Sequence, residues 1–335
     1  MRILVLGGTI FLSRAVATAA LAAGHDVTCV SRGVSGSAPA GARVLRADRS
    51  VPGELAAALA GESFDAVVDV ATMSAPWVAD ALDAVGDRAG HWTFVSSINA
   101  YADLSERGGT ARSATLPPLL EEPDRARQHT DPDLYGAAKT GSEQLVRERL
   151  GEKALVVRGG LMVGPGDLSD RFGYWAARFS RGGRAVVPDV PEQPIQVVDV
   201  RDLAGWIVRC AESGTTGTFD GTGPRSTLDR ILREVAAAVG TPDLELVRVP
   251  VPVLQAAGVS IWSGPRSLPL WLPEELWGMA DRDVTATLDA GLQARPLGET
   301  ADAALDRERE LGLDRTRTAG LSSTDEEAVL RAHAG

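Results

Sequence analysis

Cysteine and positive charge are both scarce in this sequence, and each scarcity excludes a class of protein. Cysteine occurs twice in 335 residues, at Cys29 and Cys210, and there is no Cys-x-x-Cys motif or Cys/His cluster. We therefore expect no metal site, and two reduced thiols in the core instead of a disulfide. Acidic residues outnumber basic ones by 45 to 34, for a net charge of −11. Bulk electrostatics thus argue against nucleic acid or an anionic membrane as a partner.

Long hydrophobic runs are also lacking. No apolar run reaches the roughly 18 residues that a bilayer-spanning helix needs. The first apolar strand is expected to begin at residue 2, which leaves no room for a signal peptide. These features predict a cytoplasmic protein without a membrane partner.

The first 160 residues alternate between apolar segments with strand character and segments with helical character. Strands are expected at 2–6, 25–31, 42–48, 64–70, 91–97 and 154–158, and helices at 11–24, 51–61, 75–86 and 133–150. Such alternation is typical of βαβ units and of a parallel sheet covered on both faces. The pattern predicts an α/β fold of the Rossmann type, a doubly wound parallel sheet whose ligands lie beyond the carboxyl ends of the strands.

Beyond residue 160 this rhythm loosens. Helices are expected at 170–183, 200–213, 226–240 and 299–312, with prolines and tryptophans collected between residues 250 and 277. We expect a dinucleotide-binding domain over 1–160 and a smaller C-terminal substrate lobe over 161–315, interleaved with the first. Residues 316–335 are expected to form a polar, mobile tail.

A glycine loop follows the first expected strand, in "GGTIFLS" (7–13). Gly7 fits the pattern G-x-x-G-x-x-G, but Ile10 and Ser13 stand where the other glycines belong. The strand–turn–helix context predicts a dinucleotide whose pyrophosphate lies at the helix N-terminus, while a structural turn is the alternative. The residues expected to contact the cofactor here are Gly7, Thr9, Ile10, Phe11 and Leu12.

The end of the second expected strand bears on the choice of cofactor. Ser31 and Arg32 stand where an acidic residue would bind the ribose of NAD. Because an arginine can pair with a ribose 2′-phosphate, NADP(H) is favoured and NAD(H) is the alternative. Asp48, at the end of the third strand, is expected either to contact the adenine edge or to face solvent.

A serine, a tyrosine and a lysine carry the expected chemistry. Tyr135 and Lys139, in "DLYGAAKTGSEQL", are four residues apart and share one face of a helix. An ammonium beside the phenol lowers the tyrosine pKa, and a serine from the strand end "FVSSINAY" (94–101) can hold a substrate oxygen. Together they form a proton relay suited to hydride transfer. A surface helix pair is the alternative for a Tyr-x-x-x-Lys motif that stands alone.

With these motifs the chain resembles the extended short-chain dehydrogenase/reductases, the NAD-dependent epimerase/dehydratase family. The resemblance runs from "ILVLGGTIFLSRA" through "FVSSINAY", "YGAAK" and "VVRGGLMVGPGD" to "IQVVDVRDLAGWIV" and "TGTFDGTG". It implies that Ser97 is the catalytic serine, that Tyr135 is the acid/base, and that Lys139 binds the nicotinamide ribose. It further implies cofactor contacts at Ala71 and Gly160, and a homodimer through helices 75–88 and 133–150. The expected substrate contacts are Asn99, Tyr101, Leu161 and Trp175.

The resemblance leaves three functions open. Sugar-nucleotide dehydratases of the family place Asp-Glu after the catalytic threonine, but Ile98 and Asn99 follow Ser97 here, so dehydration is disfavoured. A reductase of a ketone or aldehyde in a small molecule, or the reverse oxidation, is the leading hypothesis, and an NAD-dependent sugar or sugar-nucleotide epimerase is second. A non-catalytic RNA-binding or regulatory relative is third. The long connection between Tyr101 and Tyr135 is expected to be a lid or a mobile loop.

Overall fold

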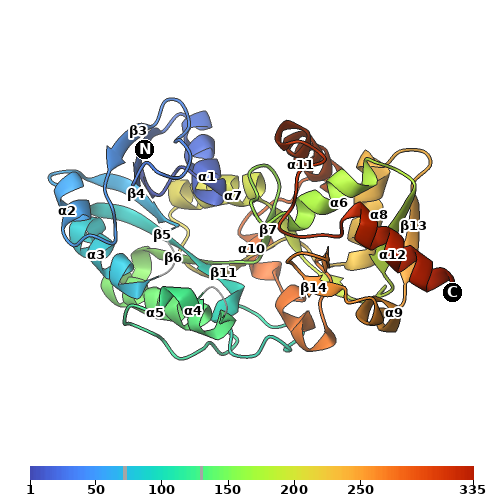
Figure 1. The fold of residues 1–335 in the computed structure, drawn as a ribbon. Coiled ribbons are helices and arrows are strands. Elements are labelled where there is room, and N and C mark those ends of the chain that lie inside the picture. The colour runs from blue at the N-terminus through green and yellow to red at the C-terminus, as the bar shows by residue number, and fades with distance from the viewer. Residues whose placement is uncertain (71–73, 129–130) are drawn as a thin grey trace.

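A seven-stranded parallel sheet forms one half of the molecule in the computed structural model, which describes residues 1–70, 74–128 and 131–335. Its strands are Arg2–Leu6 (β1), Asp26–Ser31 (β2), Arg43–Arg46 (β3), Phe64–Asp69 (β4), Ala89–Ser97 (β5), Ala154–Gly159 (β6) and Gly217–Gly221 (β11). Their order in space is β3-β2-β1-β4-β5-β6-β11. Because the chain winds outward in both directions from β1 and β4, the predicted doubly wound Rossmann-type sheet is confirmed (Figure 1).

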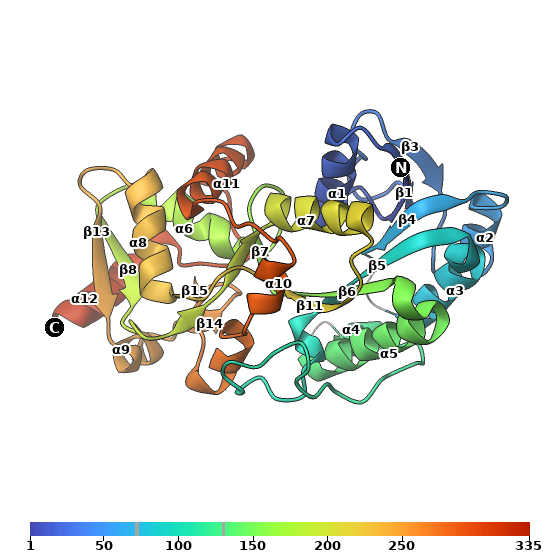
Figure 2. The same ribbon diagram turned by 180° about the vertical axis from the view of Figure 1, so that it is seen from behind.

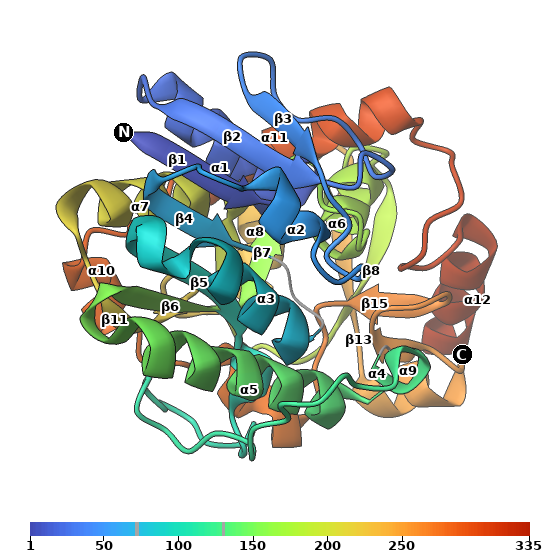
Figure 3. The same ribbon diagram turned by 90° about the vertical axis from the view of Figure 1, so that its left-hand side faces the viewer.

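Helices cover both faces of this sheet, as the continuous apolar character of its strands requires. They are Phe11–Ala22 (α1), Glu54–Ala58 (α2), Ala75–Val85 (α3), Pro132–Leu150 (α5) and Val200–Ser213 (α7). On β1, Ile3 and Val5 pack in one core cluster with α1 and α7, whereas Leu4 and Leu6 pack in another with α2 and α3. Figure 3 shows α2, α3 and α5 together on one side of the sheet.

The second half of the chain builds a smaller lobe beside the sheet (Figures 1 and 2). Its helices are Arg171–Phe179 (α6), Leu228–Val239 (α8), Val251–Ala256 (α9), Thr285–Asp289 (α10), Leu297–Leu311 (α11) and Ser323–Ala334 (α12). Its strands are short pairs: Leu161–Val163 (β7) with Val197–Asp199 (β10), Arg184–Pro188 (β8) with Glu245–Val249 (β13), Pro194–Ile195 (β9) with Ser226–Thr227 (β12), and Ser260–Trp262 (β14) with Ser267–Pro269 (β15). One hydrophobic cluster runs through this lobe, so it has a core of its own.

The expected polar tail has a different structure. Most of it forms α12, whose first turn is capped by the Ser322 side chain accepting from the Asp325 N–H. Val329 is fully buried, and Glu326 pairs with Arg178 at 2.6 Å. The prediction of a mobile tail is therefore wrong, because two buried side chains dock this helix on the lobe.

The long connection after Tyr101 is also held in place over its first half. Leu104 O accepts from Met279 N at 2.9 Å, and Gly108 N donates to Asp281 O at 2.7 Å. Helix α4 (Arg125–Gln128) follows before α5 begins. These backbone bonds tie the segment to the C-terminal lobe, so its first half is not the mobile loop that its length suggested.

Both cysteines lie where the apolar pattern places them. Cys29 and Cys210 are buried free thiols, and burial raises the pKa of each to about 11. Within the described residues, no helix is long and apolar enough to cross a membrane.

Candidate active site

The glycine loop joins β1 to α1 with backbone conformations that glycine favours. Gly7 and Gly8 have φ values of 129° and 91°, and a Cβ on Gly8 would lie 2.4 Å from the Cys29 Sγ. Helix α1 follows with no side-chain cap and no acidic residue in its first turn. The first N–H groups of α1 are thus left to bind an anion. The Ser13 hydroxyl donates to Ile10 O at 2.7 Å, which accommodates serine at the third glycine position.

A first cavity of about 280 Å³ opens beside this loop. It brings together six of the predicted cofactor residues: Gly7, Thr9, Ile10, Ser31, Arg32 and Asp48. Phe11 instead lines a neighbouring cleft, and the Leu12 side chain is buried in the core. Leu12 can therefore contact a ligand only through its backbone. Ala71 lies outside the described residues.

Arg32 and Asp48 face each other across the rim of the first cavity. The guanidinium lies 3.9 Å from the carboxylate, and both side chains are partly exposed. Although no acidic residue ends β2, the fold brings Asp48, from the segment after β3, close to Arg32. A carboxylate at this distance partly offsets the attraction of the arginine for a phosphate.

A buried ion pair that the sequence did not reveal lies beside the same cavity, with its arginine, Arg49, in the cavity wall. Arg49 binds both oxygens of Asp69, at 2.6 and 3.0 Å, and also donates to Trp77 O. Asp69 ends β4 and is fully buried. The sequence did contain a sign of this pair, because Asp69 stands at the end of an apolar strand and a buried carboxylate needs a partner.

A second cavity, of about 210 Å³, is lined by two of the three expected catalytic residues, Ser97 and Tyr135, and not by Lys139. Ser97 ends β5, and Tyr135 lies in the first turn of α5. Both line the cavity, together with Asn99 and Gly160. Ser97 donates to the Asn99 side chain at 3.0 Å and accepts from the Asn99 N–H at 3.2 Å. The structure thus brings Ser97 and Tyr135 together from separate elements.

Lys139 lies one helical turn after Tyr135 and is almost fully buried. Its Nζ donates to Val95 O at 2.8 Å and lies 5.7 Å from the centre of the Tyr135 ring. Burial lowers the pKa of Lys139 to about 8, although the carboxylates of Asp69 and Glu143 act in the opposite direction.

The pKa of Tyr135 shifts opposite to the sequence-based prediction. Burial raises it, and a hydrogen bond with Ser97 opposes the rise. The ammonium of Lys139 is directed at a backbone carbonyl, so the predicted lowering by the lysine is not found. Tyr135 is consequently a protonated phenol at neutral pH, able to donate a proton.

The two cavities lie along one edge of the sheet. The first is lined by residues that follow or end β1, β2, β3 and β4, and the second by the ends of β5 and β6. All these strands are parallel, so both cavities lie at the carboxyl edge. The first spans the point between β1 and β4 where the strand order reverses, and the second lies beside it at β5 and β6. Ligands of doubly wound folds bind at this point.

The predicted substrate contacts divide into two pairs. Asn99 and Leu161 line the second cavity. Trp175 is fully buried in the lobe core and donates to Pro269 O at 3.0 Å. Tyr101 is buried as well and lies outside the cavity wall. The structure does not place these two predicted substrate contacts in the cavity wall: Trp175 packs in the lobe core, and Tyr101 lies in a buried polar network.

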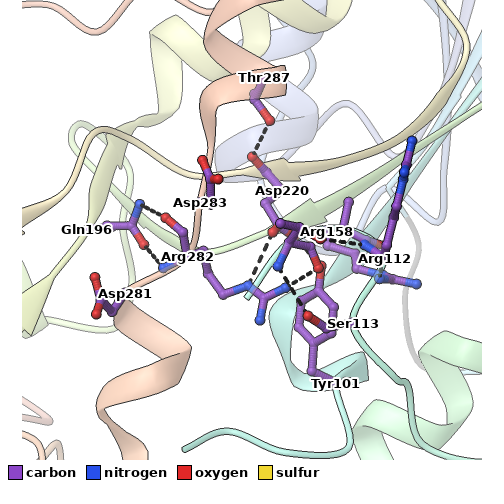
Figure 4. A network of polar contacts seen from close by, with 12 residues as sticks. Tyr101, Arg112, Ser113, Arg158, Gln196, Asp220, Asp281, Arg282, Asp283 and Thr287 are labelled. Carbon is purple, nitrogen blue, oxygen red and sulfur yellow. Dashed lines mark hydrogen bonds and ion pairs between the residues drawn. The ribbon is translucent and has the colours of Figure 1, made fainter. Parts of the chain in front are cut away.

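Tyr101 belongs to a buried polar network between the sheet and the lobe (Figure 4). Its ring lies between two guanidinium groups, 4.7 Å from Arg158 and 3.6 Å from Arg282, and its hydroxyl donates to Asp220. Arg282 also pairs with Asp220 at 3.2 Å. The Gln196 side chain accepts from Arg282 N at 2.6 Å and itself lines the cavity. The network therefore fixes one wall of the site.

Several residues that line the second cavity were not among the predicted site residues. They are Met162, Arg171, Gln196, Thr222 and Met279. Met162, Gln196 and Thr222 lie in segments that carry the family resemblance, whereas no motif marks Arg171 or Met279, which reach the cavity only when the lobe folds against the sheet.

The comparisons with known proteins agree with this geometry. The model of the NAD dependent epimerase/dehydratase family matches residues 3–219. The chain belongs to this family. A curated relative, 2'-dehydrokanamycin reductase of Streptomyces kanamyceticus, is 32% identical over 199 residues, or 56% of this chain and 52% of the relative. The chain thus matches about half the length of that protein.

Solved structures share the fold over almost the whole chain. UDP-glucose-4-epimerase of Stenotrophomonas maltophila, with bound NAD, is 16% identical, with a TM-score of 0.66 over 93% of this chain and 98% of that one. UDP-glucose 4-epimerase of Thermus thermophilus, in complex with NAD, is 19% identical, with a TM-score of 0.59 over 92% and 99%. At identities of 16% and 19%, the similarity to these two structures establishes only the fold of this chain.

Proposed function

We propose that this protein is an NAD(P)-dependent oxidoreductase of the extended short-chain dehydrogenase type. Its reaction is the reduction of a ketone or aldehyde in a small organic molecule, or the oxidation of the alcohol. The observation that carries the proposal is the convergence of Ser97 and Tyr135 on one cavity, beside the buried Lys139. The 32% identical relative, named as a reductase, supports the same reaction type.

The residues present fit a dinucleotide. The uncapped start of α1 and the bare backbone of Gly7 suit a pyrophosphate, and Ser31 and Arg32 suit the adenosine ribose. Lys139, which lies beneath the cavity walls, is assigned to the nicotinamide ribose by the family resemblance alone. When bound, the cofactor supplies or accepts the hydride.

Each residue of the relay then has a defined task. The Tyr135 hydroxyl, kept protonated by its raised pKa, donates its proton to the substrate oxygen as the carbonyl is reduced. Ser97, oriented by Asn99, holds that oxygen by a hydrogen bond. As the proton leaves Tyr135, the Lys139 ammonium, 5.7 Å from the ring centre, favours the charged phenolate that forms, while its own hydrogen bond goes to Val95 O.

A Tyr135→Phe substitution tests the relay. Turnover should fall by about a hundredfold or more, since a positioned general acid contributes about 10²–10⁴-fold. Cofactor affinity, measured by fluorescence titration, should stay within about twofold, because the hydroxyl is not a cofactor ligand in this account. The control is Tyr174→Phe, since Tyr174 is buried in the lobe core. Undiminished turnover in Tyr135→Phe would exclude the relay.

For the cofactor, our proposal is a preference for NADP(H) over NAD(H), supported by Arg32 at the end of β2. Arg32→Ala should reduce NADPH affinity by about tenfold and leave NADH almost unchanged, because only NADPH carries the 2′-phosphate. Asp48→Asn should increase the preference, since it removes the carboxylate 3.9 Å from Arg32. Calorimetric titrations with both cofactors measure this. A preference that survives Arg32→Ala would show that Arg32 has no part in it.

Epimerisation is the second candidate, because the structural neighbours named as epimerases hold NAD. An epimerase that recycles its cofactor would retain NAD through purification, which native mass spectrometry detects.

A cytoplasmic homodimer through α3 and α5 also belongs to the proposal. The dimer rests on the family resemblance, and α3 and α5 lie together on one side of the sheet (Figure 3). Light scattering tests the dimer, and cell fractionation tests the cytoplasmic location.

A further inference from the structure

The second cavity contains one charged side chain. Among the described residues that line it, Arg171 is the one with a formal charge, and the others are apolar or neutral polar residues. The carboxylate of Asp167 acts on Arg171 electrostatically, but the two form no ion pair in the described parts of the chain. An arginine in a cavity wall that is not paired with a carboxylate attracts an anion or a strong acceptor and repels a cation.

Arg171 also differs from the buried arginines elsewhere in the described parts of the chain. Arg49, Arg158 and Arg282 are each paired with a buried carboxylate. Arg171 forms no such ion pair within residues 1–70, 74–128 and 131–335. The nearby Asp167 accepts instead from the backbone and the hydroxyl of Ser169, at 2.8 and 2.9 Å.

The Arg171 side chain is fixed through its Nε and its stacked guanidinium plane, while its two terminal nitrogens form no hydrogen bond within the described residues. Nε donates to Ser169 Oγ at 3.1 Å, and the guanidinium lies 4.8 Å from the centre of the Trp262 ring. Across the described residues, neither Nη atom donates a hydrogen bond. These two atoms have the spacing that binds a carboxylate through two parallel hydrogen bonds.

A second polar group of the same cavity wall lacks a partner. Thr222 is 2% exposed, and its hydroxyl has no hydrogen bond within the described residues. A buried hydroxyl left unpaired is costly, so a ligand that supplies an acceptor or donor there gains affinity.

The remaining wall is apolar, and the space is small. Trp262, Leu161, Ile195 and Met279 line a volume of about 210 Å³, below the 300–1,000 Å³ typical of drug-sized ligand sites. A nucleoside diphosphate sugar carries two phosphates, but a single arginine lines the cavity, so this ligand class is disfavoured.

We infer that the substrate is a small carbonyl compound, or its alcohol, with one carboxylate that Arg171 binds and an apolar body that contacts Trp262. This inference rests on the proposed function, because it assigns a substrate class to the same site. Arg171 is then a specificity-determining residue.

Equilibrium binding tests the inference without turnover. The probes are benzoate, phenylacetate and 3-phenylpropanoate, each compared by calorimetry with its amide and with the amine of the same skeleton. The acid should bind wild-type protein about tenfold or more tightly than the amide, and the amine should bind least. Arg171→Met should abolish the preference for the acid, and Arg171→Lys should keep part of it. The control, Arg230→Met, replaces an arginine on the exposed face of α8.

Two results would overturn the inference. One is equal binding of acid and amide, or a preference that survives in Arg171→Met with an unchanged melting temperature. The other is the absence of acid binding at millimolar concentrations in protein that binds NADPH. Failure of the proposed function is distinct from both, since it shows in cofactor binding and in the turnover of Tyr135→Phe.

Discussion

At the scale of single residues, the burial of Lys139 has a consequence that can be measured. Burial lowers its pKa to about 8, whereas a lysine in an unfolded chain has a pKa of about 10.4. Between these values the unfolded chain binds more protons than the folded protein, so the contribution of Lys139 to stability rises with pH. Below pH 8, the folded protein bears the cost of a buried ammonium.

Replacing Lys139 by methionine removes this dependence. The free energy of unfolding of the wild type should gain about 2 kcal/mol relative to Lys139→Met between about pH 7 and about pH 9.5. Urea unfolding of both proteins at the two pH values measures it. Lys153→Met is the matched control, because Lys153 is exposed. Parallel curves for wild type and Lys139→Met would mean that the lysine is not perturbed.

The site could be predicted from the sequence only where its residues stand in motifs. Tyr135 and Lys139 follow from a four-residue spacing, and Ser97 from a strand end. Arg171 has no such signal, because it reaches the cavity only when α6 packs in the lobe. Trp175, one turn later on the same face of α6, is buried in the lobe core, and nothing in the sequence distinguishes the residue that lines the cavity from the one that packs beneath it.

At the scale of elements, the position of α5 depends on a close contact at Gly136. A Cβ on Gly136 would lie 2.0 Å from Asn99 O, so the helix can approach the end of β5 only with glycine there. The adjacent Tyr135 reaches the cavity because of this approach.

Gly136→Ala should therefore push the helix away from the strand end. We expect a loss of about 1–3 kcal/mol of stability from overpacking and about a hundredfold loss of turnover, since about 1 Å of misplacement can have that effect. Gly205→Ala is the matched control, because a Cβ there meets only the flexible end of Arg209. That change should stabilise α7 by up to about 1 kcal/mol. Thermal unfolding and turnover decide between these outcomes, and full activity in Gly136→Ala would refute the positioning role.

The longer elements of the sheet could be predicted because each buries a regular apolar pattern. The expected strand 2–6 and the expected helix 200–213 match β1 and α7 in full. Strands of two or three residues, such as β9 and β12, are too short to show a period, and they exist because they pair with each other. Helix α6 ends earlier than expected because Gly182 and Gly183 adopt positive φ values after it.

At the scale of the whole molecule, the network around Arg282 joins the two halves. Arg282 comes from the C-terminal lobe, yet it pairs with Asp220 of β11 and donates to Thr110 O of the long connection. Figure 4 shows Arg282 and Asp220 meeting beside Tyr101. Both charged side chains of the Arg282–Asp220 pair are buried. Removing one of them therefore leaves the other as a buried charge without a partner of opposite sign.

Arg282→Met should thus destabilise the protein by about 3–5 kcal/mol, the range for breaking a buried ion pair. Arg230→Met, which breaks an exposed pair with Glu234, should change stability by less than about 1 kcal/mol. Chemical denaturation of both variants measures the difference. Equal, small effects would mean that the network does not hold the halves together.

The central claim is hydride transfer between a nicotinamide cofactor and a carbonyl compound at the second cavity. The most direct measurement uses NADPH deuterated at both C4 positions, a panel of small ketones and aldehydes with and without a carboxylate, and mass spectrometry of the product. The account predicts one deuterium in the alcohol for each NADPH oxidised. With Tyr135→Phe, almost no alcohol should form and almost no NADPH should be oxidised. An unlabelled product, or no alcohol from protein that binds NADPH, would contradict it.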